Sequence, residues 1–268
     1  GGPWAKGGIR YSRALSDYTM ASLRETLAFL RDYPFYLTFF DAFGTEMSAV
    51  PIDRIEEHYK PEERLKEMAS SSELDSLEEK ALALANLISS VSGVSMDELG
   101  VTGSILLGIH VPGVSDIDLV VYGRGASLKV KEGLAQALEE SVEVTRFTPE
   151  MATSWCRRKA KTHPLSFEEA KTILARKWNI GLYRGVRFSI HPVRTEQEAE
   201  RYGDRIYKPV GEALIKATIS DAAEAMFLPA IYGVEDAQIL QGPKVYGLVE
   251  LCSYEDLYAN VAEEGEEV

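Results

Sequence analysis

The fold of this chain is decided by two short runs, VTGS at residues 101–104 and SDIDLVVYG at residues 115–123. In the second run, apolar residues occupy alternate positions, as a β-strand with a buried face requires. On such a strand Asp116 and Asp118 point to one face, whereas Ile117 and the apolar residues in step with it point into the core. The run therefore predicts a strand that presents two carboxylates side by side.

The paired carboxylates indicate a metal site. Two such groups repel each other unless a cation lies between them, and hard oxygen ligands suit Mg²⁺, which also binds phosphate oxygens. Gly103 lets the backbone approach a ligand closely, and Ser104 adds a hydroxyl and N–H groups for a phosphate. The pattern predicts a nucleoside triphosphate held by backbone on one side and by Mg²⁺, or Mn²⁺, bound to Asp116 and Asp118 on the other.

These residues resemble the signature of the nucleotidyltransferase superfamily that includes DNA polymerase beta. The signature is an apolar residue, Gly-Ser, a spacer of about ten residues and Asp-x-Asp on a strand. Residues 103–104 and 115–118 match it, and the similarity extends over residues 99–195. The whole chain looks most like predicted nucleotidyltransferases of archaea.

The resemblance implies an enzyme that transfers a nucleoside monophosphate from an NTP to an acceptor hydroxyl and releases pyrophosphate. It assigns Asp116 and Asp118 as catalytic residues that hold two metal ions. It assigns Gly103, Ser104 and Ser115 to nucleotide binding. The protein then acts mainly by positioning its substrates and neutralising charge.

One part of the signature has no clear match, because the superfamily usually carries a third carboxylate on a neighbouring strand. Glu143, which follows a predicted helix, fills that position in one alignment. In the other, which we favour slightly, the position falls on Ser189 in a predicted hairpin, and His191 projects to the same face. The second alignment leaves one metal short of a ligand, so the alternative is a catalytically weak or inactive nucleotide- or RNA-binding module.

The charge distribution limits the partners. The net charge is −13, which repels nucleic acid on average, yet ten basic and only two acidic residues lie between residues 157 and 194. This favours a confined anion site, with Arg176, Lys177, Arg184 and Arg187 as candidate triphosphate contacts. The acidic average argues against long DNA and leaves an RNA end, a protein or a small molecule as the acceptor.

The chain of 268 residues is long enough for about two domains and a cap. We expect an α+β fold with three parts: a helical or irregular N-terminal cap at 1–72, a nucleotidyltransferase domain with a mixed sheet at 73–202, and a small OB-like β-barrel at 203–268. The last part ends in an acidic tail that we expect to fray. We expect this β domain to be a platform for RNA or a protein partner.

Several elements are marked by local signals. Asp75 and Glu78 have capping-box spacing, so they predict a helix that ends at Gly93. Residues 99–107 read as one strand, and a hairpin is predicted to turn at residues 184–185.

Other classes of protein are excluded or disfavoured by the sequence. It contains no P-loop, no Cys/His spacing for zinc and no apolar run of membrane-spanning length. Two cysteines are too few for a disulfide framework. We therefore expect a cytoplasmic protein with no membrane partner.

Overall fold

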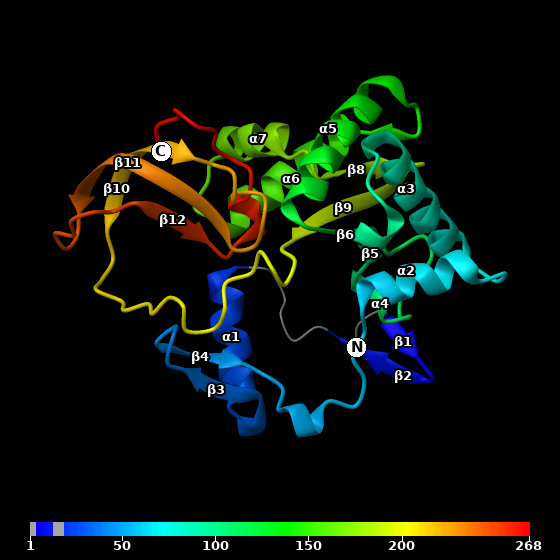
Figure 1. Ribbon diagram of the computed structural model, residues 1–268, viewed down its shortest axis with the longest axis horizontal. Coiled ribbons are helices and arrows are strands. Elements are labelled where there is room, and N and C mark those ends of the chain that lie inside the picture. Colours follow the sequence, from blue (N-terminus) through cyan, green and yellow to red (C-terminus); the bar gives the residue numbers. More distant parts are fainter. Residues whose placement is uncertain (1–3, 13–18) are drawn as a thin grey trace. The chain divides into compact units, whose positions relative to one another are not determined.

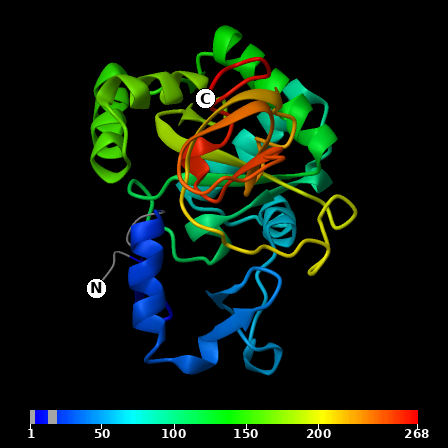
Figure 2. The same cartoon turned by 90° about the vertical axis from the view of Figure 1, so that its left-hand side faces the viewer.

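The structure is a computed structural model that describes residues 4–12 and 19–268. It divides into two compact units, whose elements are shown in two views in Figures 1 and 2. The units consist of Gly1–Arg13 with His58–Glu198, and of Ala14–Glu57 with Ala199–Val268. The division into three domains stays a prediction, because the two units are groups of residues in contact and do not test which parts of the chain fold independently.

The first unit is built on a five-stranded sheet with strand order β5-β6-β9-β8-β7. Its strands are β5 (Leu99–Val101), β6 (Ile117–Tyr122), β7 (Val144–Thr145), β8 (Ile180–Tyr183) and β9 (Val186–Val193). The pair β6–β9 is parallel, and the other neighbours are antiparallel. The prediction of an α+β fold with a mixed sheet is thereby confirmed.

The helices of this unit begin and end largely where the sequence signals them. They are α2 (Pro61–Ser70), α3 (Ser76–Ser92), α4 (Gly103–Leu106), α5 (Arg124–Glu140), α6 (Pro149–Thr162) and α7 (Phe167–Arg176). Capping boxes start α3 and α7, the former from Asp75 and Glu78, and Gly93 ends α3 in the left-handed conformation. A short hairpin, β1 (Trp4–Lys6) and β2 (Ile9–Tyr11), also belongs to this unit.

The two faces of the sheet have different roles. Ile117, Leu119 and Val121 of β6 join a buried cluster with apolar side chains of α3 and α5. Phe188 and Ile190 of β9, which stand opposite Ile117 and Leu119, belong to the same cluster. Because side chains alternate along a strand, the residues between them point to the other face. We call it the Asp118 face.

One predicted strand is only partly correct. The run expected to be extended over residues 99–107 is a strand only to Val101, and α4 begins at Gly103. Gly103 has a φ of +64°, which turns the chain out of the strand and which L-residues rarely adopt. The predicted hairpin is confirmed, because Arg184 and Gly185 both have positive φ between β8 and β9.

The described residues of the second unit form one α-helix and two small sheets. Its elements are α1 (Met20–Leu30), β3 (Leu37–Phe40), β4 (Thr45–Ser48), β10 (Leu214–Asp221), β11 (Ala230–Gln241) and β12 (Glu250–Ser253). Figure 2 shows α1, in dark blue, beside the lighter hairpin of β3 and β4, which it contacts. Strands β10, β11 and β12 form an antiparallel sheet around a core that includes Ile219 and Tyr232.

Two expectations for this unit change. Among residues 4–12 and 19–268 the sheet of β10–β12 does not close on itself, so the OB-like barrel is not confirmed. Within this sheet, Gly233 of β11 stands opposite Asp221, where a Cβ would crowd the neighbouring strand. The acidic end does not fray, because the backbone of Val268 exchanges hydrogen bonds with Ala217 and Glu267 pairs with Lys216.

None of the described helices combines the length and the apolar character needed to cross a lipid bilayer.

Candidate functional site

The predicted acidic residues lie together on the Asp118 face of the sheet. Asp118 stands directly opposite Ser189 of the parallel strand β9, so their side chains point to the same side. Asp116 precedes β6 by one residue and forms an ion pair with Arg187 (Nη2 to Oδ2, 3.2 Å). Asp116 and Arg187 are 71 residues apart in the sequence and therefore lie side by side only because β6 and β9 are neighbours in the sheet.

A chain of polar contacts leads from Asp118 along β9. The hydroxyl of Ser189 donates a hydrogen bond to Oδ1 of Asp118 (2.5 Å) and is also 2.8 Å from Nε2 of His191. His191 Nε2 is 3.9 Å from the same carboxylate oxygen. The side chains of Asp118, Asp116 and His191 are 24%, 45% and 41% exposed, so water and small ligands reach this face.

Gly103 forms one side of the site because its backbone is pressed against Asp118. The N–H of Thr102 donates to the carbonyl of Asp118 (2.8 Å), which holds the turn beside β6. A Cβ at Gly103 would overlap Oδ2 of Asp118. A residue with a side chain therefore cannot occupy this position unless the carboxylate moves. The sequence predicted a close approach here, and the neighbour that the structure shows is the carboxylate itself.

The two predicted serines have different surroundings. Ser104 lies in the first turn of α4, next to Gly103, and its carbonyl accepts a hydrogen bond from Ile109. The hydroxyl of Ser115 accepts a hydrogen bond from the N–H of Val111 (3.0 Å), so it closes the loop that leads into β6. The predicted contacts of Gly103, Ser104 and Ser115 with a nucleotide stay predictions.

Of the two candidates for the third carboxylate position, Ser189 is the one beside Asp118. Glu143 lies next to the edge strand β7, and β8 and β9 separate that strand from β6. Its carboxylate pairs with Arg184 (Nη2 to Oε1, 2.7 Å). The neighbour of Asp118 is thus a hydroxyl that can ligate a cation but brings no negative charge.

The donors on this face fit a hard divalent cation. Asp116, Asp118 and Ser189 offer two carboxylates and a hydroxyl, which are oxygen ligands of the kind that Mg²⁺ prefers. His191 adds a nitrogen donor on the same side. Arg187 now balances the charge of Asp116, so a cation that binds both aspartates competes with this guanidinium.

The basic residues that were candidate triphosphate contacts separate in the structure. Arg187 reaches Asp116, whereas Arg184 pairs with Glu143 at the far edge of the sheet. Lys177 is buried and lines a cavity between α6, α7 and β8, and Arg176 is exposed at the end of α7. Among these four, Arg187 is therefore the residue that the structure pairs with Asp116.

A second cluster with metal-binding residue types was not predicted. Asp75, Glu78 and His110 place ligand atoms within 4.8 Å of one another, and His110 Nε2 is 2.7 Å from Asp75 Oδ2. Asp75 also caps α3, and the guanidinium of Arg64 pairs with Glu78. The capping box was visible in the sequence, but nothing in it signalled that His110 would arrive from a distant loop.

The electrostatics of this cluster follow from its hydrogen bonds. Burial raises the pKa of the Asp75 carboxyl, but hydrogen bonds from the backbone of Glu78 and from His110 outweigh burial. The net result is a pKa below the usual range. The charges of the cluster are therefore already used to stabilise the fold.

The chain is similar in sequence to an archaeal protein. The chain is 33% identical to an uncharacterized protein of Methanocaldococcus jannaschii over 199 residues, which cover 72% of this chain and 54% of that archaeal protein. The chain thus spans about half the length of this relative. No protein-family model matches the sequence, and no solved structure matches it.

Proposed function

We propose that this protein is a nucleotidyltransferase that depends on Mg²⁺ or Mn²⁺ and moves a nucleoside monophosphate from an NTP to an acceptor hydroxyl. The observation that carries the proposal is the arrangement around Asp118. Asp116 shares its face, Gly103 lies against its carboxylate, and Ser189 stands beside it on a parallel strand. Gly103, Asp116 and Asp118 also carry the resemblance to the nucleotidyltransferase superfamily, whereas Ser189 departs from its signature.

The two aspartates are the residues that would hold the metal. When bound there, the cation would neutralise phosphate charge and lower the pKa of the acceptor hydroxyl. Gly103 and Ser104, on the β5 side of Asp118, hold the triphosphate through backbone N–H groups and the serine hydroxyl. Arg187 leaves Asp116 and pairs with a phosphate oxygen.

The reaction breaks one bond and forms another at the α-phosphorus. The acceptor oxygen bonds to this phosphorus, and the bond to the bridging oxygen of pyrophosphate breaks. We assign the proton of the acceptor hydroxyl to His191, which lies on the same face 3.9 Å from Asp118. Most of the rate enhancement comes from positioning and charge neutralisation.

A transfer assay tests this proposal. The protein is incubated with labelled NTPs, Mg²⁺ or Mn²⁺ and three groups of acceptors: RNA, proteins and small molecules. We expect label transfer and pyrophosphate release, both lost in Asp118→Ala. The matched control is Asp97→Ala, which removes an exposed aspartate that pairs with Lys66 on the surface. Transfer that survives Asp118→Ala contradicts the proposal.

The three groups of acceptors in this assay also test which partner the protein acts on. RNA is the acceptor that the basic residues of the first unit favour, and a protein hydroxyl or a small molecule is the alternative. The second unit, with its open sheet of β10–β12, is the proposed platform for RNA or a protein partner. Transfer to RNA alone, with no label on protein or small molecules, assigns the acceptor.

A second candidate function follows from one residue. Ser189 occupies the position beside Asp118 where the superfamily usually has a carboxylate. A protein with this substitution binds Mg²⁺–NTP as a regulatory or RNA-binding module without turnover. Calorimetry that detects Mg²⁺–NTP binding, together with no pyrophosphate release for any acceptor, selects this function over the first.

A further inference from the structure

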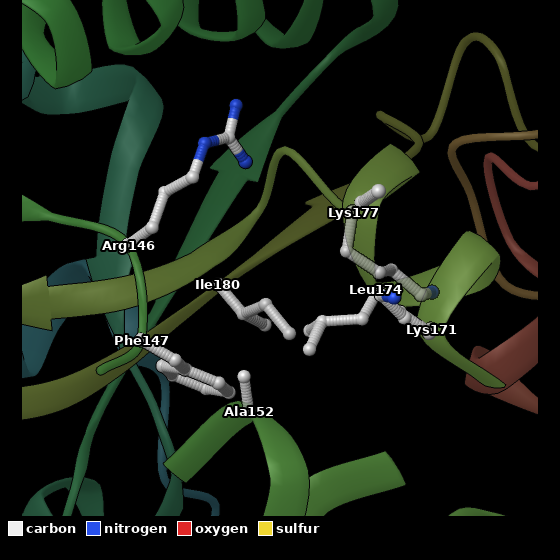
Figure 3. Close-up of a pocket in the computed structure, with 8 residues that line it drawn as sticks. Arg146, Phe147, Ala152, Lys171, Leu174, Lys177 and Ile180 are labelled. Carbon is white, nitrogen blue, oxygen red and sulfur yellow. The ribbon is translucent and has the colours of Figure 1, made fainter. Parts of the chain in front are cut away.

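A cavity lies in the same unit as the paired aspartates, between α6, α7 and the edge of the sheet. Its volume is about 430 Å³. Figure 3 shows Ile180 of β8 and Leu174 of α7 converging on it, with Phe147 and Ala152 on a third side. These apolar side chains form a surface on which a flat ring can pack.

The charged residues that line this cavity are all basic. They are Arg146, Lys171 and Lys177, and none of the described lining residues is acidic. Figure 3 shows Arg146 on one side of the cavity and Lys171 on the other. Arg146 makes no ion pair with any side chain in the described part of the chain, and Lys171 has only the exposed Glu168 as an acidic partner, at 3.6 Å. The cavity therefore combines an apolar wall with cations that an anion can engage.

The register of the sheet connects this cavity to Asp118. Ile180 stands directly opposite Ser189, which stands directly opposite Asp118, so all three side chains lie on the Asp118 face. Two inter-strand steps of about 4.8 Å separate Ile180 from Asp118. Gly103 and Ser104 lie on the other side of Asp118, next to β5.

We infer that this cavity binds the acceptor, and that the acceptor is a nucleoside monophosphate group. Its base packs on Phe147 and Ile180, and its free hydroxyl points along the sheet toward Asp118. Arg146 and Lys171, on the two sides of the cavity (Figure 3), attract its phosphate. The inference rests on the proposed function for the reaction at Asp118, but the binding itself does not require it. The group is either a free nucleotide or the last nucleotide of an RNA strand, which share this chemistry.

Equilibrium binding tests the inference without any turnover. AMP is titrated into Asp118→Asn protein in metal-free buffer, and binding is followed by calorimetry. We expect Arg146→Glu and Lys171→Glu each to weaken AMP binding about tenfold, since each replaces an attractive charge by a repulsive one. The matched control is Lys129→Glu, an exposed charge reversal on α5, which leaves the affinity unchanged.

The apolar wall has its own test. Phe147→Ala is expected to weaken AMP binding about tenfold, because it removes an aromatic ring on which the base packs. Inorganic phosphate is the competitor that separates the two parts of the site, and it should displace AMP only at far higher concentration. Phosphate that competes as well as AMP shows that the ring is not recognised and overturns the inference.

Competition with a short RNA that ends in a free 3′ hydroxyl distinguishes a free nucleotide from the last nucleotide of an RNA strand as the natural ligand. If this RNA displaces bound AMP at a lower concentration than added AMP does, the natural ligand is the terminal nucleotide of an RNA strand. If added AMP is the better competitor, the natural ligand is the free nucleotide. Equal AMP binding by the Asp118→Asn protein with and without Arg146→Glu or Lys171→Glu overturns the inference, whatever the transfer assay gives. Loss of AMP binding in these variants supports it even if no transfer is found, so the two proposals fail separately.

Discussion

Two groups of carboxylates in the first unit look alike in composition but differ in what surrounds them. Asp75 and Glu78 are held by a helix start, by His110 and by Arg64, so their charges serve the fold. Asp116 and Asp118 lie on an open sheet face, where one pairs with a half-exposed arginine and the other with a serine hydroxyl. Acidic residues alone do not indicate a functional site, and the difference lies in whether the fold already uses their charge.

The largest expected effect separates the two groups by activity. Asp118→Asn keeps the size of the side chain but removes its charge, and transfer should fall about a thousandfold if the residue stabilises charge in the transition state. Asp75→Asn should leave transfer within about twofold, because its side chain is used in capping. Initial rates of pyrophosphate release measure both. Equal losses in the two variants would remove the distinction between the groups.

The second effect concerns the contact between Gly103 and Asp118. Gly103→Ala forces a left-handed backbone on an L-residue and also places a Cβ on the carboxylate, so the free energy of unfolding should fall by about 3 kcal/mol. Gly113→Ala is the control, since Gly113 has a φ of +83° and a Cβ there meets no atom within 4 Å in the described chain. It should cost only about 1 kcal/mol. Urea denaturation measures the free energy of unfolding of both variants. Equal losses would show that the Asp118 carboxylate moves away from the added Cβ at little cost.

The third effect concerns Asp75, which belongs to the group of carboxylates whose charges stabilise the fold. Asp75→Ala removes the cap of α3 and the partner of His110, and should lower the free energy of unfolding by about 1–2 kcal/mol. Asp75→Asn should cost less, since an amide also caps a helix.

The same residue gives a pH dependence. The folded-state pKa of Asp75 is lowered, so its charge stabilises the fold above the ordinary carboxyl pKa of about 3.9, and this stabilisation is lost as the pH falls through the folded value. The stability difference between wild type and Asp75→Asn should therefore be largest above about pH 5 and vanish in strong acid. A difference that grows as the pH falls would contradict the assignment.

The smallest effect tests the position beside Asp118. Ser189→Asp places a third carboxylate there, and without metal it should destabilise the protein by roughly 1 kcal/mol through repulsion. Added Mg²⁺ should restore this loss and bind more tightly than in wild type. Thermal unfolding with and without Mg²⁺ measures both, with Ser189→Asn as an uncharged control. If Mg²⁺ stabilises Ser189→Asn as much as Ser189→Asp, the position is not a metal site.

Local signals in the sequence predicted much of the first unit. The alternation in residues 115–123 placed Asp118 opposite the core face, and the capping box of α3 and the Arg184-Gly185 turn were found where expected. These features depend on neighbours within a few residues, which a single sequence shows directly. The start of α4 was missed because the apolar run hid the backbone turn at Gly103.

Features that depend on distant residues could not be predicted in the same way. The sequence left the choice between Glu143 and Ser189 open, since only the register of β9 on β6 brings Ser189 to Asp118. The contact of His110 with Asp75 and the docking of the C-terminus on β10 also join segments far apart. The open sheet of β10–β12 was expected to be a closed barrel because short β-segments look alike in both architectures.

The parallel pairing of β6 with β9 has a consequence for biosynthesis. Asp118 and Ser189 are 71 residues apart, and parallel strands cannot pair until the crossover between them is complete. At about 5–20 residues per second, a nascent chain carries Asp118 for roughly 4–14 s before Ser189 is made. During this interval β6 has an unpaired edge, so a ribosome-bound intermediate exposes the strand on which the whole site depends.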